Sequence, residues 1–144
     1  MAGHSAGGYL TSMIGLDKRW LEPYGIDPDT AFVALIPYSG QVVTHFERRR
    51  ELGLPDTQPL VDDMAPLSYV RPDCRPMLIL SGDREREMLG RYEENAYFWR
   101  MMRVAGHPDV RICEFDGFDH GNMPQAGHFV AVRYIREMER RMDR

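Results

Sequence analysis

Six residues near the start of the chain, Gly3-His4-Ser5-Ala6-Gly7-Gly8, carry the strongest chemical signal in the sequence. Their spacing fits glycine-x-serine-x-glycine, in which a nucleophilic serine stands on a tight turn between a strand and a helix. Glycines on both sides of the serine lack a Cβ, so the backbone can close around it. The following helix points its N–H groups and the positive end of its dipole at the reaction centre. Ser5 is therefore the candidate nucleophile.

A serine hydroxyl needs a histidine to accept its proton, and a carboxylate to hold that histidine in the correct tautomer. The chain order that goes with this turn is serine, acid, histidine. His120 lies in the loop Asp116-Gly-Phe-Asp-His-Gly121, after a predicted strand. His4 lies inside the turn and is expected to point elsewhere, and the other histidines lie in an excursion or at helix ends. His120 is the candidate base, with an ordinary surface-loop histidine as the alternative.

The candidate acid lies in a crowded turn. Asp83, Glu85 and Glu87 all follow the short apolar run Met77-Leu-Ile-Leu80 and its Ser81-Gly82 end. All three come between Ser5 and His120 in the chain, which is the required order. The turn alone leaves the choice among them open.

The hydrophobic pattern predicts the elements that must position these residues. Apolar residues at steps of three and four predict helices, and short continuous apolar runs predict strands that are covered on both faces. Alternation of the two kinds predicts an α/β fold, a parallel sheet with helices on both faces. A polar, turn-rich excursion over 41–63 is expected as a surface loop or a lid segment. The predicted helices are 5–20, 87–105 and one from near Pro124 or Gln125, and the predicted strands are 31–36, 77–80 and 110–115.

Composition limits the classes of partner. The 144 residues suffice for one domain, and a net charge of −4 gives no electrostatic case for nucleic acid or an anionic membrane. No apolar stretch approaches the roughly 18 residues that a membrane span needs. Two cysteines suggest no disulfide framework. A small molecule is the expected partner, and the compartment stays open.

The chain resembles the α/β-hydrolase superfamily, in its carboxylesterase and lipase branch, near the hormone-sensitive-lipase-like and bacterial acetyl- or feruloyl-esterase-like enzymes. The resemblance spans essentially the whole chain as the C-terminal part of that fold, as a single partial domain over 1–144. Only two residues precede the turn, so the early strands of the fold are expected to be missing, and 31–36 should lack a neighbour on one side. The matching segments are Gly3 to Gly8, Ala65-Pro-Leu-Ser-Tyr69, Pro76 to Glu85 and Asp116 to Gly121.

The resemblance implies further site residues. In many members the strand ends in a glycine and the acid follows three residues later, which from Gly82 is Glu85, although aspartate is usual there. Asp83 has the usual chemistry at another offset, so Glu85 is favoured and Asp83 stays a candidate. The backbone amide of Ala6 would be one oxyanion donor. Other donors in the family come from an early H-G-G-G stretch, which this sequence lacks.

Two functions are consistent with these residues. The first is a serine ester hydrolase that acts on a small-molecule ester through an acyl-enzyme and requires no metal or organic cofactor. The second is a truncated or degenerate hydrolase-fold chain that is inactive alone, and that either serves as a scaffold or needs a partner half. A homo-oligomer or a missing N-terminal half would then complete the site, because loss of one oxyanion donor alone costs about 10²–10³ in turnover.

Overall fold

A four-stranded parallel sheet forms the centre of the computed structural model, which describes residues 1–88 and 90–143. The strands follow one another across the sheet in chain order, and each pairs in parallel with the next. This confirms the predicted α/β fold with a parallel sheet. The strands are β1 (Ala2–His4), β2 (Ile36–Tyr38), β3 (Met77–Gly82) and β4 (Val110–Phe115).

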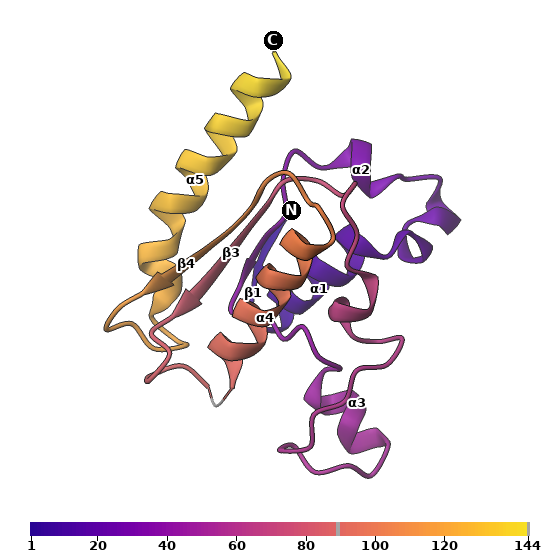
Figure 1. The fold of residues 1–144 in the computed structure, drawn as a ribbon, viewed down its shortest axis with the longest axis vertical. Coiled ribbons are helices and arrows are strands. Elements are labelled where there is room, and N and C mark those ends of the chain that lie inside the picture. The colour runs from indigo at the N-terminus through magenta and orange to yellow at the C-terminus, as the bar shows by residue number, and fades with distance from the viewer. Residues whose placement is uncertain (89, 144) are drawn as a thin grey trace.

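Helices cover both faces of the sheet (Figure 1). On one face lie α1 (Ala6–Leu16) and α4 (Arg91–Val104), and on the other lies α5 (Met123–Met142). Short helical segments fill the connections: η1 (Lys18–Trp20), η2 (Glu22–Tyr24), α2 (Pro28–Ala31), α3 (Phe46–Glu51) and η3 (Pro66–Tyr69).

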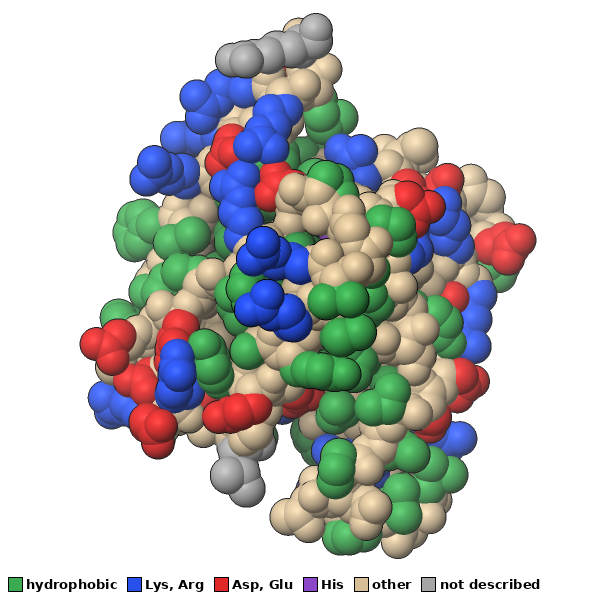
Figure 2. Space-filling model, in the orientation of Figure 1, with side chains coloured by type: hydrophobic (Ala, Val, Ile, Leu, Met, Phe, Trp, Pro, Cys, Tyr) green, Lys and Arg blue, Asp and Glu red, His purple; other side chains and the backbone are tan. Residues whose placement is uncertain are grey.

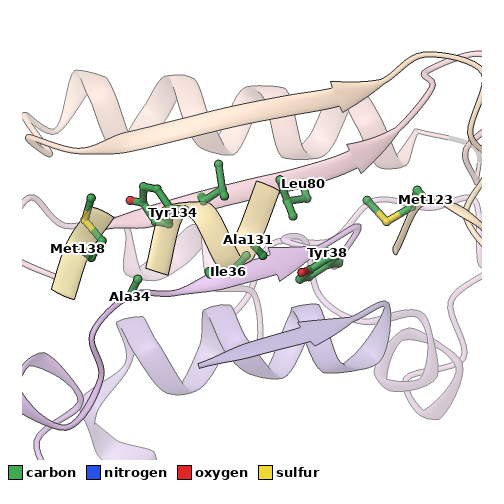
Figure 3. Packing of buried hydrophobic residues seen from close by; sticks show 9 residues of the cluster. Ala34, Ile36, Tyr38, Leu80, Met123, Ala131, Tyr134 and Met138 are labelled. Atoms are coloured by element: carbon green, nitrogen blue, oxygen red, sulfur yellow. The ribbon is translucent and has the colours of Figure 1, made fainter. Parts of the chain in front are cut away.

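Strand β3 is buried on both faces of the sheet, which is why its sequence is a continuous apolar run. Met77 and Ile79 pack into the cluster shared with α1 and α4, while Leu78 and Leu80 pack into the cluster under α5. Successive side chains of a strand point to opposite faces, so burial on both faces removes the usual apolar–polar alternation. Figure 3 shows the α5 side of this core, with Tyr134 and other side chains lying between α5 and the strands.

The predicted strand 31–36 is wrong in its position. Asp27 accepts a hydrogen bond from the Asp29 backbone N–H, and with Pro28 in the first turn this starts the short helix α2. The chain therefore becomes extended only later, and the strand is β2. The expected loss of a neighbour is also wrong, because Ala2 pairs with Ile36 across β1 and β2. The sheet ends at β1 on this side.

Two predicted helices begin or end elsewhere. The first ends at Leu16 rather than residue 20, because the Asp17 side chain accepts from the Arg19 backbone N–H and starts η1. The predicted helix 87–105 begins at Arg91, after Gly90 with a φ of 74°. Leu89, which that prediction included, lies outside the described residues.

The excursion over 41–63 carries α3, whose charged residues are not all solvated. Arg48 and Arg50 form exposed ion pairs, as a mixed-charge helix face would. Arg49 instead is buried, and its Nη1 donates to the carbonyl oxygens of Asp56 and Gln58. Arg49 therefore fastens the second half of the excursion to α3.

The surface carries no sign of a membrane-spanning element among the described residues. None of the helices within 1–88 and 90–143 is long and apolar enough to cross a membrane. Figure 2 shows Lys and Arg side chains gathered towards the C-terminal end of α5, where Arg140 and Arg141 lie in the last turn. The net charge of the chain is nevertheless −4.

Candidate active site

Ser5 stands on a strained turn between β1 and α1. Its φ of 56° and ψ of −115° lie in a region that residues with a side chain rarely adopt. Such a conformation costs on the order of 1–3 kcal/mol and persists only where neighbouring structure enforces it. Here the Ser5 backbone N–H donates to the carbonyl oxygen of Tyr38 at 2.9 Å, which ties the turn to the end of β2.

Glycines allow two close backbone approaches around this turn. A Cβ on Gly3 would lie 2.4 Å from the carbonyl oxygen of Gly7, and one on Gly8 would lie 2.8 Å from Cα of Gly40. A Cβ on Gly7 would meet nothing within 4 Å. The expectation that a Cβ would obstruct the turn therefore holds for Gly3. At Gly7 a Cβ would fit, and it is the backbone of Gly7 that Gly3 approaches.

The Ser5 side chain points to His120 and does not cap α1. A serine before a helix commonly accepts a hydrogen bond from the first turn, but Ser5 makes no such bond to α1. Its Oγ lies 2.9 Å from Nε2 of His120 instead. The first N–H groups of α1, beginning with Ala6, have no partner within the helix and lie at its positive end. The Ala6 backbone amide, which the sequence analysis predicted as an oxyanion donor, is the first of these N–H groups.

His120 connects Ser5 to a buried carboxylate, which is Glu87. Nδ1 of His120 lies 2.9 Å from Oε2 of Glu87, whose side chain has no exposed surface. Burial alone would raise the pKa of Glu87, but hydrogen bonds from His120, Ser39 and the Met88 backbone outweigh it and lower the pKa to about 2. Glu87 is therefore ionised at neutral pH and orients the imidazole.

The sequence favoured Glu85, with Asp83 as the other candidate, as the partner of His120. The structure instead places Glu87 against His120. Glu85 is exposed, and its backbone N–H donates to Oδ1 of Asp83. Oδ2 of Asp83 accepts from the backbone N–H of Gly117 at 2.8 Å, and such backbone donors lower the Asp83 pKa. Asp83 thus fastens the turn to the loop that carries His120, and neither carboxylate is hydrogen-bonded to His120.

The turn after β3 explains why Glu87, and neither Asp83 nor Glu85, contacts His120. The Glu87 backbone N–H donates to the Asp83 carbonyl oxygen at 2.8 Å, which forms one helical turn directly after β3. This turn brings Glu87 back over the end of the strand, where Gly82 N–H donates to its Oε1 at 3.2 Å. Glu87 was visible in the sequence as the third acid of the crowded turn, but its distance from the glycine gave no reason to choose it.

His4 does not point away from the site, as the sequence analysis expected. Its Nε2 donates to the carbonyl oxygen of His120 at 2.8 Å, and the two rings lie 4.7 Å apart. Burial and the neighbouring His120 lower the pKa of His4, so it holds the His120 backbone as a neutral ring. Sequence reasoning missed this role and that of Ser39, whose hydroxyl donates to Oε1 of Glu87.

A groove lies between α3 and the beginning of α4. Met88, the neighbour of Glu87 in the chain, is among the residues that line it, whereas Ser5, Glu87 and His120 are not. Val43 and Phe46 give it apolar wall, and the buried Arg91 gives it a polar side. In the described part of the chain, no group of three or more His, Cys, Asp or Glu side chains is placed to hold a metal ion.

Comparisons with known proteins identify the fold. Neither a protein-family model nor a curated protein matches the sequence. Among solved structures, esterase 2 of the planctomycete Thermogutta terrifontis with propionate bound matches with a TM-score of 0.71 at 21% identity, over 95% of this chain and 54% of that chain. The butyrate-bound form gives 0.69 at 20%, over 95% and 55%. The form phosphorylated by paraoxon gives 0.65 at 21%, over 95% and 52%. The chain therefore has the fold of about half of that esterase.

Proposed function

We propose that the chain carries the nucleophile, base and acid of a serine ester hydrolase of the carboxylesterase type. The observation that carries the proposal is the continuous hydrogen-bonded chain from Ser5 through His120 to Glu87, with both links at 2.9 Å. The strained turn that carries Ser5 supports it. So does the fold shared with an esterase whose structures hold propionate or butyrate, which favours small acyl groups.

The geometry supports acyl transfer in two halves. Nε2 of His120 takes the proton of Ser5 as Oγ bonds to the ester carbonyl carbon, and it returns that proton to the departing alcohol. Water then attacks the acyl-enzyme as His120 accepts a proton from it, and His120 returns that proton to Oγ of Ser5 as the acyl–Oγ bond breaks and the acid is released. Glu87 remains ionised throughout and stabilises the imidazolium that forms in each half.

The oxyanion that forms in each half needs two or more N–H donors. We propose the backbone amide of Ala6 as one donor, because Ala6 is the first residue of α1 and the positive end of the helix dipole adds to its effect. Loss of one donor typically costs about 10²–10³ in turnover. We therefore expect the chain alone to turn over esters slowly.

A second candidate function is favoured by a specific observation, the coverage of only 52–55% of the matching esterase structures. A chain of this kind could need a further polypeptide to complete the site, or serve as a scaffold without activity. The chemical reactivity of Ser5 distinguishes these two cases, because a scaffold does not require a reactive serine. Reactivity of Ser5 without turnover would favour a site that needs completion.

The excursion over 41–63 is the segment that we propose shapes substrate binding. Phe46 and Val43 line the groove that Met88, the chain neighbour of Glu87, also lines, and the buried Arg49 holds the excursion in place. An acyl chain or the alcohol part of an ester would pack against these apolar side chains. The segment would then act as part of a wall or lid.

Hydrolysis of p-nitrophenyl acetate, propionate and butyrate tests the proposal. We expect slow hydrolysis by the chain, lost in Ser5→Ala and in His120→Ala. Ser12→Ala is the control, because it also removes a serine hydroxyl, in this case a buried one that has no hydrogen-bond partner among the described residues. Hydrolysis that survives Ser5→Ala would contradict the proposed nucleophile.

A further inference from the structure

Ser39 occupies a position where a serine is conformationally unfavourable. It follows β2, is fully buried, and has a φ of 46°. Its backbone is held on both sides, since its N–H donates to Leu80 O at 2.7 Å and its carbonyl accepts from Nη1 of Arg91. The carbonyl of the next residue, Gly40, accepts from Asn95 Nδ2 at 2.9 Å. The loop is therefore rigid enough to enforce the strain.

The hydroxyl of Ser39 contacts two members of the proposed site. It donates to Oε1 of Glu87, and its oxygen lies 3.0 Å from Nδ1 of His120. An ionised carboxylate only accepts hydrogen bonds, so the one hydroxyl hydrogen is committed to Glu87. Oγ of Ser39 can therefore only accept from His120, which requires the hydrogen to be on Nδ1.

We propose that Ser39 is a positioning residue of the Ser5–His120–Glu87 site. It fixes the plane of the Glu87 carboxylate through Oε1, and it favours the tautomer of His120 that carries hydrogen on Nδ1. Nε2 is then unprotonated and accepts the Ser5 proton. This inference rests on the proposed function, and it assigns Ser39 no contact with the substrate.

The choice of residue argues against a purely structural role. Glycine adopts a positive φ without the steric cost that a side chain brings, so a loop that needed only this backbone shape would be better served by glycine. The chain has glycine at the following position but serine at 39. The hydroxyl is thus retained in spite of the strain. Its hydrogen bond is also among those that hold the Glu87 pKa low.

Two variants separate the hydroxyl from the backbone. Ser39→Gly removes the hydroxyl and relieves the strain at φ 46°, which offsets part of the cost of the lost hydrogen bond, so the variant is expected to fold. Ser39→Ala removes the hydroxyl and keeps the Cβ, which provides a second test if the glycine variant fails to fold. Ser12→Ala again removes a buried serine hydroxyl, in this case one without a partner among the described residues.

The first measurement does not depend on activity. Nitrogen-15 NMR of the histidine side chains, with the His120 signals identified by their loss in His120→Ala, reports which ring nitrogen carries hydrogen. We expect the wild-type chain to show the Nδ1–H form, and the Ser39 variants to show a smaller share of it, because Glu87 alone then accepts from Nδ1. Ser12→Ala should match the wild-type spectrum.

The second measurement is the rate at which a fluorophosphonate labels Ser5. Loss of one hydrogen bond to a charged group is expected to slow labelling about tenfold in Ser39→Gly and Ser39→Ala. Wild-type tautomer signals and labelling rates in the folded variants would overturn the inference. A wild-type chain that is not labelled would contradict the proposed function instead, and the NMR comparison would then decide the role of Ser39 alone.

Discussion

Replacing Glu87 by glutamine is the most informative perturbation of the site, because it keeps the shape and removes the charge. In the structure all contacts of this carboxylate come from donors: His120 Nδ1 and Met88 N–H at Oε2, and Gly82 N–H and the Ser39 hydroxyl at Oε1. A glutamine amide must place its NH₂ group against one of these donor pairs. If it faces His120, the ring has to accept at Nδ1 and carry hydrogen on Nε2, where it can no longer take the Ser5 proton.

The size of the effect follows from this change of tautomer. A comparable acid-to-amide change in a serine protease lowers turnover about 10⁴-fold, which corresponds to about 5 kcal/mol of lost transition-state stabilisation. We expect a loss of this order for Glu87→Gln. Glu85→Gln alters an exposed side chain and should stay within about twofold of wild type. The loss of activity in Asp83→Asn should lie between those of the other two variants, because Asp83 holds the loop of His120 through Gly117 N–H.

The assay is the second-order rate of Ser5 labelling by a fluorophosphonate, measured for the three variants beside p-nitrophenyl acetate hydrolysis. Circular dichroism and the urea midpoint of each variant show whether it is folded. A folded Glu87→Gln chain that reacts at the wild-type rate would refute the assignment of the acid. A loss in Glu85→Gln as large as that in Glu87→Gln would refute the geometry of the turn.

Three further predictions concern the turn, the acid and the groove. Gly3→Ala should lower the free energy of unfolding by about 1–3 kcal/mol because its Cβ meets the Gly7 carbonyl, whereas Gly7→Ala should raise it by up to about 1 kcal/mol, as urea titrations would show. The Glu87 pKa is lowered to about 2, so its contribution to stability is present above the ordinary value of 4.5 and is lost as the pH falls towards 2. Glu87→Gln should therefore lose less stability than wild type between about pH 5 and about pH 3, and an equal loss would argue against an ionised Glu87. Phe46→Ala should raise KM more for p-nitrophenyl butyrate than for the acetate, and equal KM changes would place the acyl group outside the groove.

The sequence was sufficient to predict the parallel sheet, and it also named Ser5 and His120, whose Oγ and Nε2 atoms the structure places 2.9 Å apart. The run Met77 to Leu80 predicted a strand because burial on both faces leaves only apolar residues. Ser5 and His120 could be found because each lies at a turn with neighbouring glycines, after a strand. Contacts between residues 115 positions apart then followed from the parallel topology, which brings strand ends together at one edge.

Other parts depended on local geometry that spacing does not encode. The sequence favoured two carboxylates that do not contact His120, because one helical turn from Asp83 to Glu87 decides which carboxylate lies over the end of β3. Ser39 belongs to no motif, and its φ of 46° arises from contacts with Leu80 and Arg91 that lie far away in the chain. The displaced strand β2 was predictable, because Asp27 followed by proline is a helix-start signal.

Intact-mass analysis after fluorophosphonate treatment, followed by peptide mapping, tests the central claim most directly. We predict a single adduct on Ser5, formed by the wild-type chain and by Ser12→Ala, and absent from His120→Ala and Ser5→Ala under the same conditions. Labelling of Ser5 that persists in His120→Ala, or an adduct on another residue, would contradict the proposed site.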